Sequence, residues 1–585
     1  MKFENKNLRL KMAGAVLLAT MCLINTGCNK QKEINQNDPN IQSKISVSIA
    51  GILDKSIEST VLKSSNRQSE SAQLLEVKHY GEFDASVSID GDLPSQHSDR
   101  RVIASNHRVG SGTKAAIMDP GKTFRLFLFK TDGSYVGSSA LESGTPESVD
   151  VEQGMTYNWY AISFNNAENI PDITESNPEI NLTEGKDVLH AAGQITIPTG
   201  TNVTVALPIT FNRKTSRVAV ELNSMGMFGS MTNATVSVSG LSIKTGSINI
   251  VNGQWSDLTN SNQVINWSSF SDVDPLFQDR KIAYVYTVDS TSSNNVVVSV
   301  SNLGVNHADG NTRNFSATPV NFVFNSIQAD IGSSQRLLLN LVESPLTVTQ
   351  GGVTVHWARS NLYYEAGHNP YRFYGINALN SSTDGKGYFA FGSIIPRKFH
   401  TSGLIGDPCA EVYPKGVWRQ PKNTEFAPLT TADGLLTDVL GNILGILVAD
   451  PAPNASGDGT YIQYPITSGG SNPGFLASSN QLRFYYNGEI TDVNVVTDFG
   501  PDGLVNLDLG TSHGTQGALW TNVSGTNLLN LIGLGAWGYH ASDKSTIFGS
   551  NFIGAIGTAE LLSDVNVGGL DLVSSTFKSV RCVRN

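Results

Sequence analysis

Apolar and polar residues alternate along much of the chain, and this alternation predicts β-strands. Near the start, Ile45, Val47 and Ile49 alternate with serines, which is the period of a strand with one buried face. Residues 203–220 continue the same pattern over a longer stretch. We therefore predict a mainly β protein in which short strands are joined by turns.

A hairpin is predicted where an aromatic run meets a turn signal. Residues 124–129 read Phe-Arg-Leu-Phe-Leu-Phe, and Asp132-Gly133 follows them. An Asp-Gly pair favours a tight turn, so the chain is expected to return through Tyr135 and Val136. Further strands are predicted over residues 154–161, 296–300 and 337–341.

The first 28 residues have the organisation of an export signal. Basic residues precede an apolar run over residues 12–24, and the run ends in Asn25-Thr26-Gly27-Cys28. The run has the length of the apolar part of a signal peptide and is too short to cross a bilayer. We therefore predict that the chain is exported.

The end of this segment resembles the lipobox of bacterial lipoproteins, in which the cysteine thiol carries a diacylglycerol. The resemblance implies that residues 1–27 are a signal peptide, that Cys28 carries lipid such as palmitate, and that residues 28–43 are a polar tether to the outer membrane. Asn25 departs from the aliphatic residue that is usual three places before the cysteine. The alternative is an ordinary secretory signal that is cleaved nearby.

Cysteine usage agrees with an oxidising compartment. The chain holds four cysteines, and removal of Cys22 with the signal and of Cys28 to lipid leaves Cys409 and Cys582. Neither has a neighbouring Cys or His at the spacing of a tetrahedral metal site, so a disulfide is the better interpretation. A bridge that closes so long a loop is worth roughly 4–5 kcal/mol in the chain-entropy model.

Composition narrows the class of protein. A chain of 585 residues has room for about three or four domains. Charged residues make up only 16%, and Gly, Ser, Thr and Asn are frequent, which favours strands and turns over long charged helices. The net charge of −11 argues against nucleic acid as a partner.

Further segments of the N-terminal half carry a recognisable pattern. They read Phe-Arg-Leu-Phe-Leu-Phe at residues 124–129, Asp-Gly-Ser-Tyr-Val at 132–136, Gly-Met-Thr-Tyr at 154–157 and Leu-Pro-Ile-Thr-Phe-Asn-Arg at 207–213. Together they resemble the fimbrillin family, the lipoprotein-derived pilins of Bacteroidetes surface fimbriae, over roughly residues 45–345. The resemblance implies two β-sandwich domains in tandem, at residues 44–206 and 207–345, and other fimbrial subunits as partners.

Fimbrillins assemble by strand addition, and in some relatives an arginine-specific protease first removes the N-terminal strand. The resemblance therefore implies processing at an arginine in polar surroundings, and the candidates are Arg67, Arg101 and Arg108. The alternative is that these arginines are solvated surface charges. An incoming strand would complete the opened sheet through main-chain hydrogen bonds.

The sequence changes character after Pro345. Aromatic strands at residues 357–364 and 371–374 are followed by Gly-Val-Trp-Arg-Gln-Pro at 416–421 and by Ser-Val-Arg-Cys-Val-Arg at 579–584. This combination resembles C-type-lectin-like modules of bacterial surface proteins, which are related in fold to formylglycine-generating enzymes. The resemblance implies an α+β domain over residues 346–585 in which the first and last strands pair, the last strand is interior and Cys582 is bridged to Cys409.

No catalytic constellation is visible in the sequence. Histidines occur singly, and the formylglycine-generating relatives use paired thiols, whereas Cys409 has no second thiol near it. We therefore expect neither an enzyme nor a cofactor. Acids in loops form no twelve-residue calcium loop, so we expect no metal site. These acids are Asp450, Asp458, Asp502 and Asp508.

Ligand-binding residues are not assigned. Residues 484–488 and 537–540 are aromatic and are candidates for a sugar-stacking platform, but strands of a compact module are more often buried. The stretch from Trp418 to Phe426, with Pro421 and Glu425, favours a short helix docked on the core over a ligand pocket.

These patterns together predict a tip or accessory subunit of a fimbrium that mediates cell adhesion. The expected architecture is two fimbrillin-like β-sandwich domains followed by a lectin-like module, anchored to the outer membrane and exposed at the cell surface. The expected target is a host or bacterial surface protein or glycan. One alternative is a lipid-anchored surface glycan-binding protein, and a weaker one is an enzyme on the formylglycine-generating scaffold.

Overall fold

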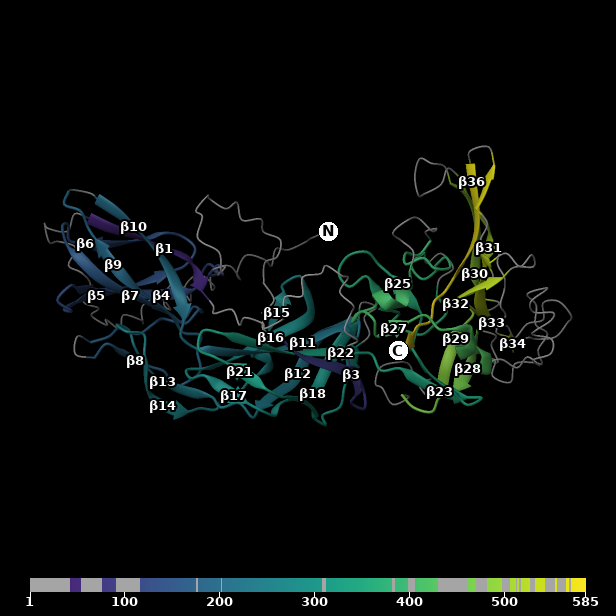
Figure 1. The fold of residues 1–585 in the computed structure, drawn as a ribbon, viewed down its shortest axis with the longest axis horizontal. Coiled ribbons are helices and arrows are strands. Elements are labelled where there is room, and N and C mark those ends of the chain that lie inside the picture. The colour runs from purple at the N-terminus through teal and green to yellow at the C-terminus, as the bar shows by residue number, and fades with distance from the viewer. Residues whose placement is uncertain are drawn as a thin grey trace, which may run out of the picture.

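The computed structural model confirms the mainly β fold class. Figure 1 shows two β domains and a C-terminal module that follow one another along the molecule. Among the described residues, no helix is long and apolar enough to cross a membrane. The structure describes residues 43–53, 76–90, 116–174, 177–200, 203–307, 312–380, 385–397, 406–429, 460–469, 481–496, 505–511, 513–514, 517–526, 532–541, 553–554, 564–567 and 570–585.

The first domain is built on one seven-stranded sheet. Its strands are β1 (Ser43–Leu53), β4 (Thr123–Lys130), β5 (Tyr135–Glu142), β6 (Glu147–Val151), β7 (Thr156–Ser163), β9 (Leu189–Thr196) and β10 (Val203–Arg213), in the order β5-β4-β7-β9-β10-β1-β6. The edge strands β5 and β6 are joined by a short turn, so the sheet encloses a core that includes Ile45, Leu126, Tyr157 and Ile209. The predicted hairpin is confirmed, because β4 pairs with β5.

Two sheets face each other in the second domain. One contains β2 (Lys78–His79), β3 (Asp84–Asp90), β11 (Ser216–Gly226), β15 (Ser271–Asp274), β16 (Phe277–Thr287) and β22 (Ser334–Val342). The other contains β12 (Gly229–Ser239), β18 (Val296–His307), β19 (Thr312–Asn314) and β20 (Val320–Phe324). Alternating side chains such as Leu222, Val298, Phe322 and Leu339 fill one core between them. The remaining elements are β17 (Thr291–Ser293), β21 (Ile327–Ala329) and the 3₁₀ turn η1 (Trp267–Ser269).

A small shared sheet joins the two domains. It consists of β8 (Glu179–Asn181), β13 (Lys244–Asn249) and β14 (Trp255–Asn260), in the order β14-β13-β8. Strand β8 lies between β7 and β9 of the first domain along the chain, whereas β13 comes after β12 of the second domain, so backbone hydrogen bonds cross the boundary. Phe127 and Phe129, on the outer face of the first sheet, pack in one apolar cluster with Ile248 and Ile250.

The C-terminal module is a set of small sheets around two apolar clusters. Its strands are β23 (Leu346–Gln350), β24 (Val353–Trp357), β25 (Leu362–Tyr364), β26 (Tyr371–Phe373), β27 (Trp418–Arg419), β28 (Tyr461–Pro465), β29 (Gln481–Tyr485), β30 (Glu489–Val496), β31 (Val505–Thr511), β32 (Gly517–Thr526), β33 (Ile532–Ala541), β34 (Ile553–Gly554), β35 (Asp564–Val567), β36 (Leu570–Lys578) and β37 (Val583–Arg584). Helical structure in its described part is limited to η2 (Pro408–Glu411), α1 (Asn423–Phe426) and η3 (Ala427–Leu429).

The α+β class of the module and its lectin-like character stay predictions. The last strand, β37, lies inside a sheet of order β23-β24-β37-β27. The first strand of the module, β23, does not pair with β37, because β24 lies between them.

The sheets divide the chain differently from the predicted domain limits. Strand β10 continues through residue 207 to Arg213 and belongs to the first sheet, because its alternation is unbroken up to the turn at Lys214. Residues 84–90, expected in the first domain, form β3 of the second, where they pair with β22. Alternation identifies a strand but not its partner, and therefore the pairing of β3 with β22 escapes the sequence.

Candidate functional site

Strand β1 is an interior strand of the first sheet. It pairs in parallel with β10 along its length and antiparallel with β6 over residues 43–47. Ile45, Val47 and Ile52 point into the core and are at most 4% exposed. Loss of β1 would leave unpaired backbone edges on β10 and β6 and an apolar groove between them. The groove would be lined by the core residues Val149, Val151, Leu207, Ile209 and Phe211.

The N-terminal segment contributes β1 to the first domain, and β2 and β3 to the second. After β1 the described chain resumes at residue 76 and pairs β3 with β22 of the second domain before it returns to the first domain at β4. Phe83 and Ala85 are buried in the second core. The two domains are therefore interleaved, and β1 and β3 are held by different cores.

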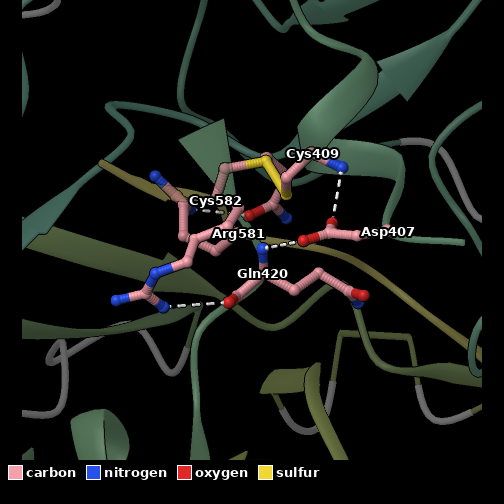
Figure 2. The surroundings of a disulfide bond; sticks show 7 residues. Asp407, Cys409, Gln420, Arg581 and Cys582 are labelled. Atoms are coloured by element: carbon pink, nitrogen blue, oxygen red, sulfur yellow. Dashed lines mark hydrogen bonds between the residues drawn. A yellow bond between two sulfur atoms is a disulfide. The ribbon is translucent and has the colours of Figure 1, made fainter. Parts of the chain in front are cut away.

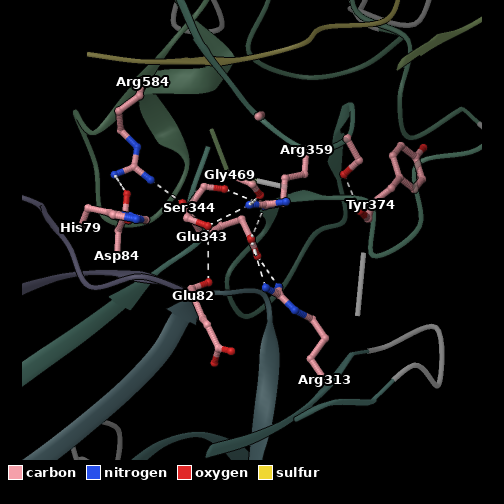
Figure 3. A network of polar contacts seen from close by, with 12 residues as sticks. His79, Glu82, Asp84, Arg313, Glu343, Ser344, Arg359, Tyr374, Gly469 and Arg584 are labelled. Atoms are coloured by element: carbon pink, nitrogen blue, oxygen red, sulfur yellow. Dashed lines mark hydrogen bonds and ion pairs between the residues drawn. The ribbon is translucent and has the colours of Figure 1, made fainter. Parts of the chain in front are cut away.

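A buried charge network closes the junction between the second domain and the C-terminal module. Figure 3 shows Glu343 between Arg313, which comes from β19, and Arg359, which comes from the module. Its Oε1 lies 3.2 Å from Nη2 of Arg313 and 3.0 Å from Nε of Arg359. Arg359 also donates to the carbonyl oxygen of Ser344 and to Gly469. Burial lowers the pKa of Arg359 to about 10, and Glu343 opposes that shift, so the guanidinium remains charged at neutral pH.

A second ion pair ties strand β3 to the last strand. Oδ2 of Asp84 lies 3.0 Å from Nη1 of Arg584 in β37, and Oδ1 lies 2.7 Å from Nδ1 of His79 (Figure 3). Arg584 also donates to the carbonyl oxygen of Glu343. Burial lowers the pKa of Arg584, and Asp84 counteracts this. The strand that precedes β4 in the chain is thus fixed to the last strand of the chain.

Neutral contacts accompany the charges at this junction. Tyr413 of the module donates to Oδ1 of Asn340 at 2.8 Å and accepts from Nδ2 of Asn223 at 2.7 Å. His368 lies 2.7 Å from Asp279 and stacks on the ring of Phe277 at 3.8 Å between centroids. Each of these contacts joins the second domain to the module.

Cys409 and Cys582 form a disulfide that fixes β37 to the turn η2 (Figure 2). Asp407 caps that turn by accepting from the backbone N–H of Cys409 at 2.8 Å and from that of Gln420 at 2.8 Å. Burial raises the pKa of Asp407, although these hydrogen bonds work in the opposite direction. The bridge therefore lies in a locally ordered turn.

Arg581, next to the disulfide, is a fully buried cation held by oxygen acceptors. It donates to Oδ1 of Asn361 and to the carbonyl oxygens of Ala358 and Arg483, and it lies over the ring of Phe484. Burial lowers its pKa to about 9. Arg581 links three segments of the module and has a structural role.

The short helix predicted around Glu425 is confirmed as α1. Phe426 is completely buried, and Arg419 donates to both carboxylate oxygens of Glu425. Burial alone would raise the pKa of Glu425, but the hydrogen bonds from Arg419 and Lys422 lower it. The stretch therefore packs on the core, as expected.

Other sequence candidates are buried or lie outside the description. Phe484, Tyr486 and Tyr539 are buried, so they do not present a sugar-stacking face. Cys28, Arg67, Arg101, Arg108, Asp450, Asp458 and Asp502 fall outside the described residues. No cluster of three or more metal-binding side chains occurs within the described part of the chain.

The junction residues were missed by sequence reasoning. Arg359 and Arg584 each follow directly on apolar residues. A charged side chain that is buried beside such residues needs an oppositely charged or hydrogen-bonding partner, and this was the available signal. Their partners Glu343 and Asp84 are distant in sequence, and nothing in the local pattern connects them.

No protein-family model matches the sequence, and no curated protein matches it. Similar solved structures include a candidate cell adhesion protein from Bacteroides fragilis, which is 13% identical and aligns over 54% of this chain and 95% of that chain with a TM-score of 0.26. The fimbrial anchor protein Mfa2 from Porphyromonas gingivalis is 12% identical over 54% of this chain and 99% of that chain, with a TM-score of 0.22. A fimbrial assembly protein from Parabacteroides distasonis is 11% identical over 40% and 86%, with a TM-score of 0.21. At these values the likeness does not assign a family.

Proposed function

We propose that the protein is a tip or accessory subunit of a surface fimbrium, anchored through Cys28, that takes part in adhesion and assembles by strand addition. The observation that carries the proposal is the position of β1. It is an interior strand that contributes buried side chains. Along the chain, however, it is connected to β4, the next strand of its own sheet, only through residues 54–122, which also supply β2 and β3 of the second domain. Its departure would create an acceptor for a neighbour's strand.

The positions of β1 and β3 distinguish between the candidate processing sites. Cleavage after Arg67 would release β1 and leave β3 in the second domain. Cleavage after Arg101 or Arg108 would also detach β3, which holds Phe83 and Ala85 in the second core and Asp84 against Arg584. We therefore propose Arg67 as the site that opens the first domain without damage to the second.

The C-terminal module favours a position at an end of the filament. The residues around β37 are fixed by pairing with β24 and β27, by the Cys409–Cys582 bridge and by the bond from the Asn585 N–H to the carbonyl oxygen of Val417. This stretch is not available to complete a neighbour's sheet. The module would then face the target.

A reversible lock on β1 tests the assembly mechanism. Ser46 and Ser148 are directly opposed on β1 and β6, and neither is buried. Ser46→Cys combined with Ser148→Cys should form a disulfide that retains β1 after cleavage. Under oxidising conditions we expect the double variant to be absent from purified fimbriae, and mild reduction should restore it. Each single variant is the matched control, and incorporation of the locked form would overturn strand replacement.

Immunogold microscopy with antibody against residues 346–585 tests the position. Label at filament ends is the expected result. Label along the shaft would make the protein a repeating subunit, and label on the cell surface without filaments would favour the glycan-binding lipoprotein. An Arg67→Ala variant, compared with Arg101→Ala, tests the processing site in the same cells.

A further inference from the structure

A pocket lies where the second domain meets the C-terminal module. Its volume is about 250 Å3, and its wall combines Phe228 and His307 of the second domain with Tyr363, Phe373, Tyr374 and Asn380 of the module. Each part supplies one side only, so the pocket exists only when the two parts are docked. The buried charges around Glu343 and Arg584 hold them in that relation.

The backbone of Phe228 adopts an unfavourable conformation. It lies in the two-residue turn between β11 and β12 with a φ of 59°, a left-handed conformation that is rare for a bulky residue. Its ring meets that of Phe373 edge to face, with centroids 5.0 Å apart. A strained residue persists where its surroundings fix it, and such residues cluster at binding sites.

The opposite wall is held in place as well. The rings of Tyr363 and Tyr374 lie 4.6 Å apart. The hydroxyl of Tyr374 rests against Gly387, where a Cβ atom would approach it to 2.6 Å. The backbone of Asn380 is fixed on both sides, since its N–H donates to Asn487 and its carbonyl oxygen accepts from His513. Both aromatic side chains are only partly buried, so part of each is open to solvent.

The chemistry of the wall selects the class of ligand. None of the described lining residues is Asp, Glu, Lys or Arg, so the wall offers an ionic ligand no carboxylate, ammonium or guanidinium partner in exchange for its hydration. Aromatic faces accept an apolar ring face, whereas the Asn380 amide, for which the described residues provide no partner, can bond hydroxyl groups at the rim. A pyranose ring offers both an apolar face and polar edges.

We propose that this pocket binds one neutral sugar residue of a surface glycan. The inference deepens the proposed adhesive role by naming its target class, and it rests on that role for its biological meaning. It does not depend on strand addition, because none of these residues belongs to the β1 groove.

The test uses the full-length protein, purified from membranes in detergent, on an array of neutral, sialylated and sulfated glycans. Neutral glycans should bind, and their affinities should then be measured by calorimetry. Phe228→Gly removes one wall while placing glycine at a positive φ, and Gly387→Ala displaces Tyr374 without truncating it. We expect each variant to weaken binding by about tenfold or more, in line with the loss of an aromatic contact.

Tyr461→Ala is the matched control, because Tyr461 and Tyr485 form a similar partly exposed ring pair outside the pocket, with centroids 5.1 Å apart. It should leave affinity within about twofold, a free-energy change well below that of a lost contact. Binding restricted to charged glycans, no glycan binding, or equal affinity in all variants would overturn the proposal. Incorporation of the pocket variants into fimbriae is measured separately, so a failed pocket and a failed fimbrial role give different results.

Discussion

Both junctions of the molecule contain apolar contacts, such as those of Phe228 and Val342 with Phe373 at the second one, but they differ in the buried ion pairs that accompany them. Between the first and second domains, an apolar cluster around Phe129 and Ile248 and the shared sheet of β8 and β13 form a continuous core. Between the second domain and the C-terminal module, Glu343 and Asp84 hold Arg359 and Arg584. Apolar packing tolerates small changes of orientation, whereas a buried ion pair requires defined partners at defined distances.

This difference suits the roles proposed for the two junctions. The first must keep the domains together whether β1 or a neighbour's strand fills the groove. The second must present Phe228 and Tyr374 in one fixed relation, because the pocket is formed by both parts. The proposed sugar binding therefore depends directly on orientation at the second junction.

The largest effect is expected from Glu343→Gln. Glu343 is completely buried between two guanidinium groups, and its neutralisation leaves both without a full counter-charge. We expect a loss of about 3–5 kcal/mol in the free energy of unfolding, measured by urea with tryptophan fluorescence. The control is Asp289→Asn, which breaks a partly exposed pair with Lys244 and should cost about 0.5 kcal/mol. Equal losses would show that charge does not hold the junction.

Ile248→Ala tests the apolar junction. Ile248 is fully buried in the shared cluster, and truncation leaves a cavity worth about 2–4 kcal/mol. Hydrogen exchange at β8 should accelerate while the module remains protected. Leu258→Ala, at a side chain that is 43% exposed on β14, is the control and should change stability by less than about 0.5 kcal/mol. Faster exchange in the module would contradict independent junctions.

Tyr413→Phe measures the neutral part of the second junction. The change removes the hydroxyl that bridges Asn223 and Asn340 and leaves their amides less satisfied. Burial raises the pKa of Tyr413 to about 12, so the hydroxyl remains protonated across the physiological range. We expect a loss of about 1–2 kcal/mol in urea unfolding. A loss as large as that of Glu343→Gln would assign the junction to hydrogen bonds instead of charge.

The smallest effect concerns pH at the first junction. His190 is buried, its Nε2 lies 2.7 Å from the carbonyl oxygen of Ile250, and burial lowers its pKa. Below about pH 6.5 the unfolded chain binds a proton that the folded chain does not, so stability should fall as pH decreases. In the His190→Gln variant, the midpoint of urea unfolding should vary less with pH between 7.5 and 5.5. An unchanged slope would assign the pH dependence to other groups.

Local patterns in the sequence predict local structure well. Asp132-Gly133 fixes the β4–β5 hairpin, and the alternation at Ile45 and Val47 identifies both a strand and its buried face. Pro421 and Phe426 likewise indicate the short helix α1. In each case the determining residues lie within a few positions of one another.

The sequence does not predict which distant strands and side chains pair with each other. Strand β1 pairs with β10 and β3 with β22, although many strands share their alternation. For that reason the sequence does not reveal that residues 84–90 belong to the second domain. The partners of Arg359 and Arg584, and the pocket wall at Phe228, also depend on docking between parts that are distant in sequence.

The Cys409–Cys582 bridge also governs how the molecule carries mechanical load. The cysteines are separated by 173 positions, a stretch that would extend by about 590 Å at roughly 3.4 Å per residue if it unravelled. A pull between the second domain and strand β37 passes through the covalent bond and bypasses this length. Under tension the C-terminal module would therefore resist lengthening while the non-covalent junctions yield first.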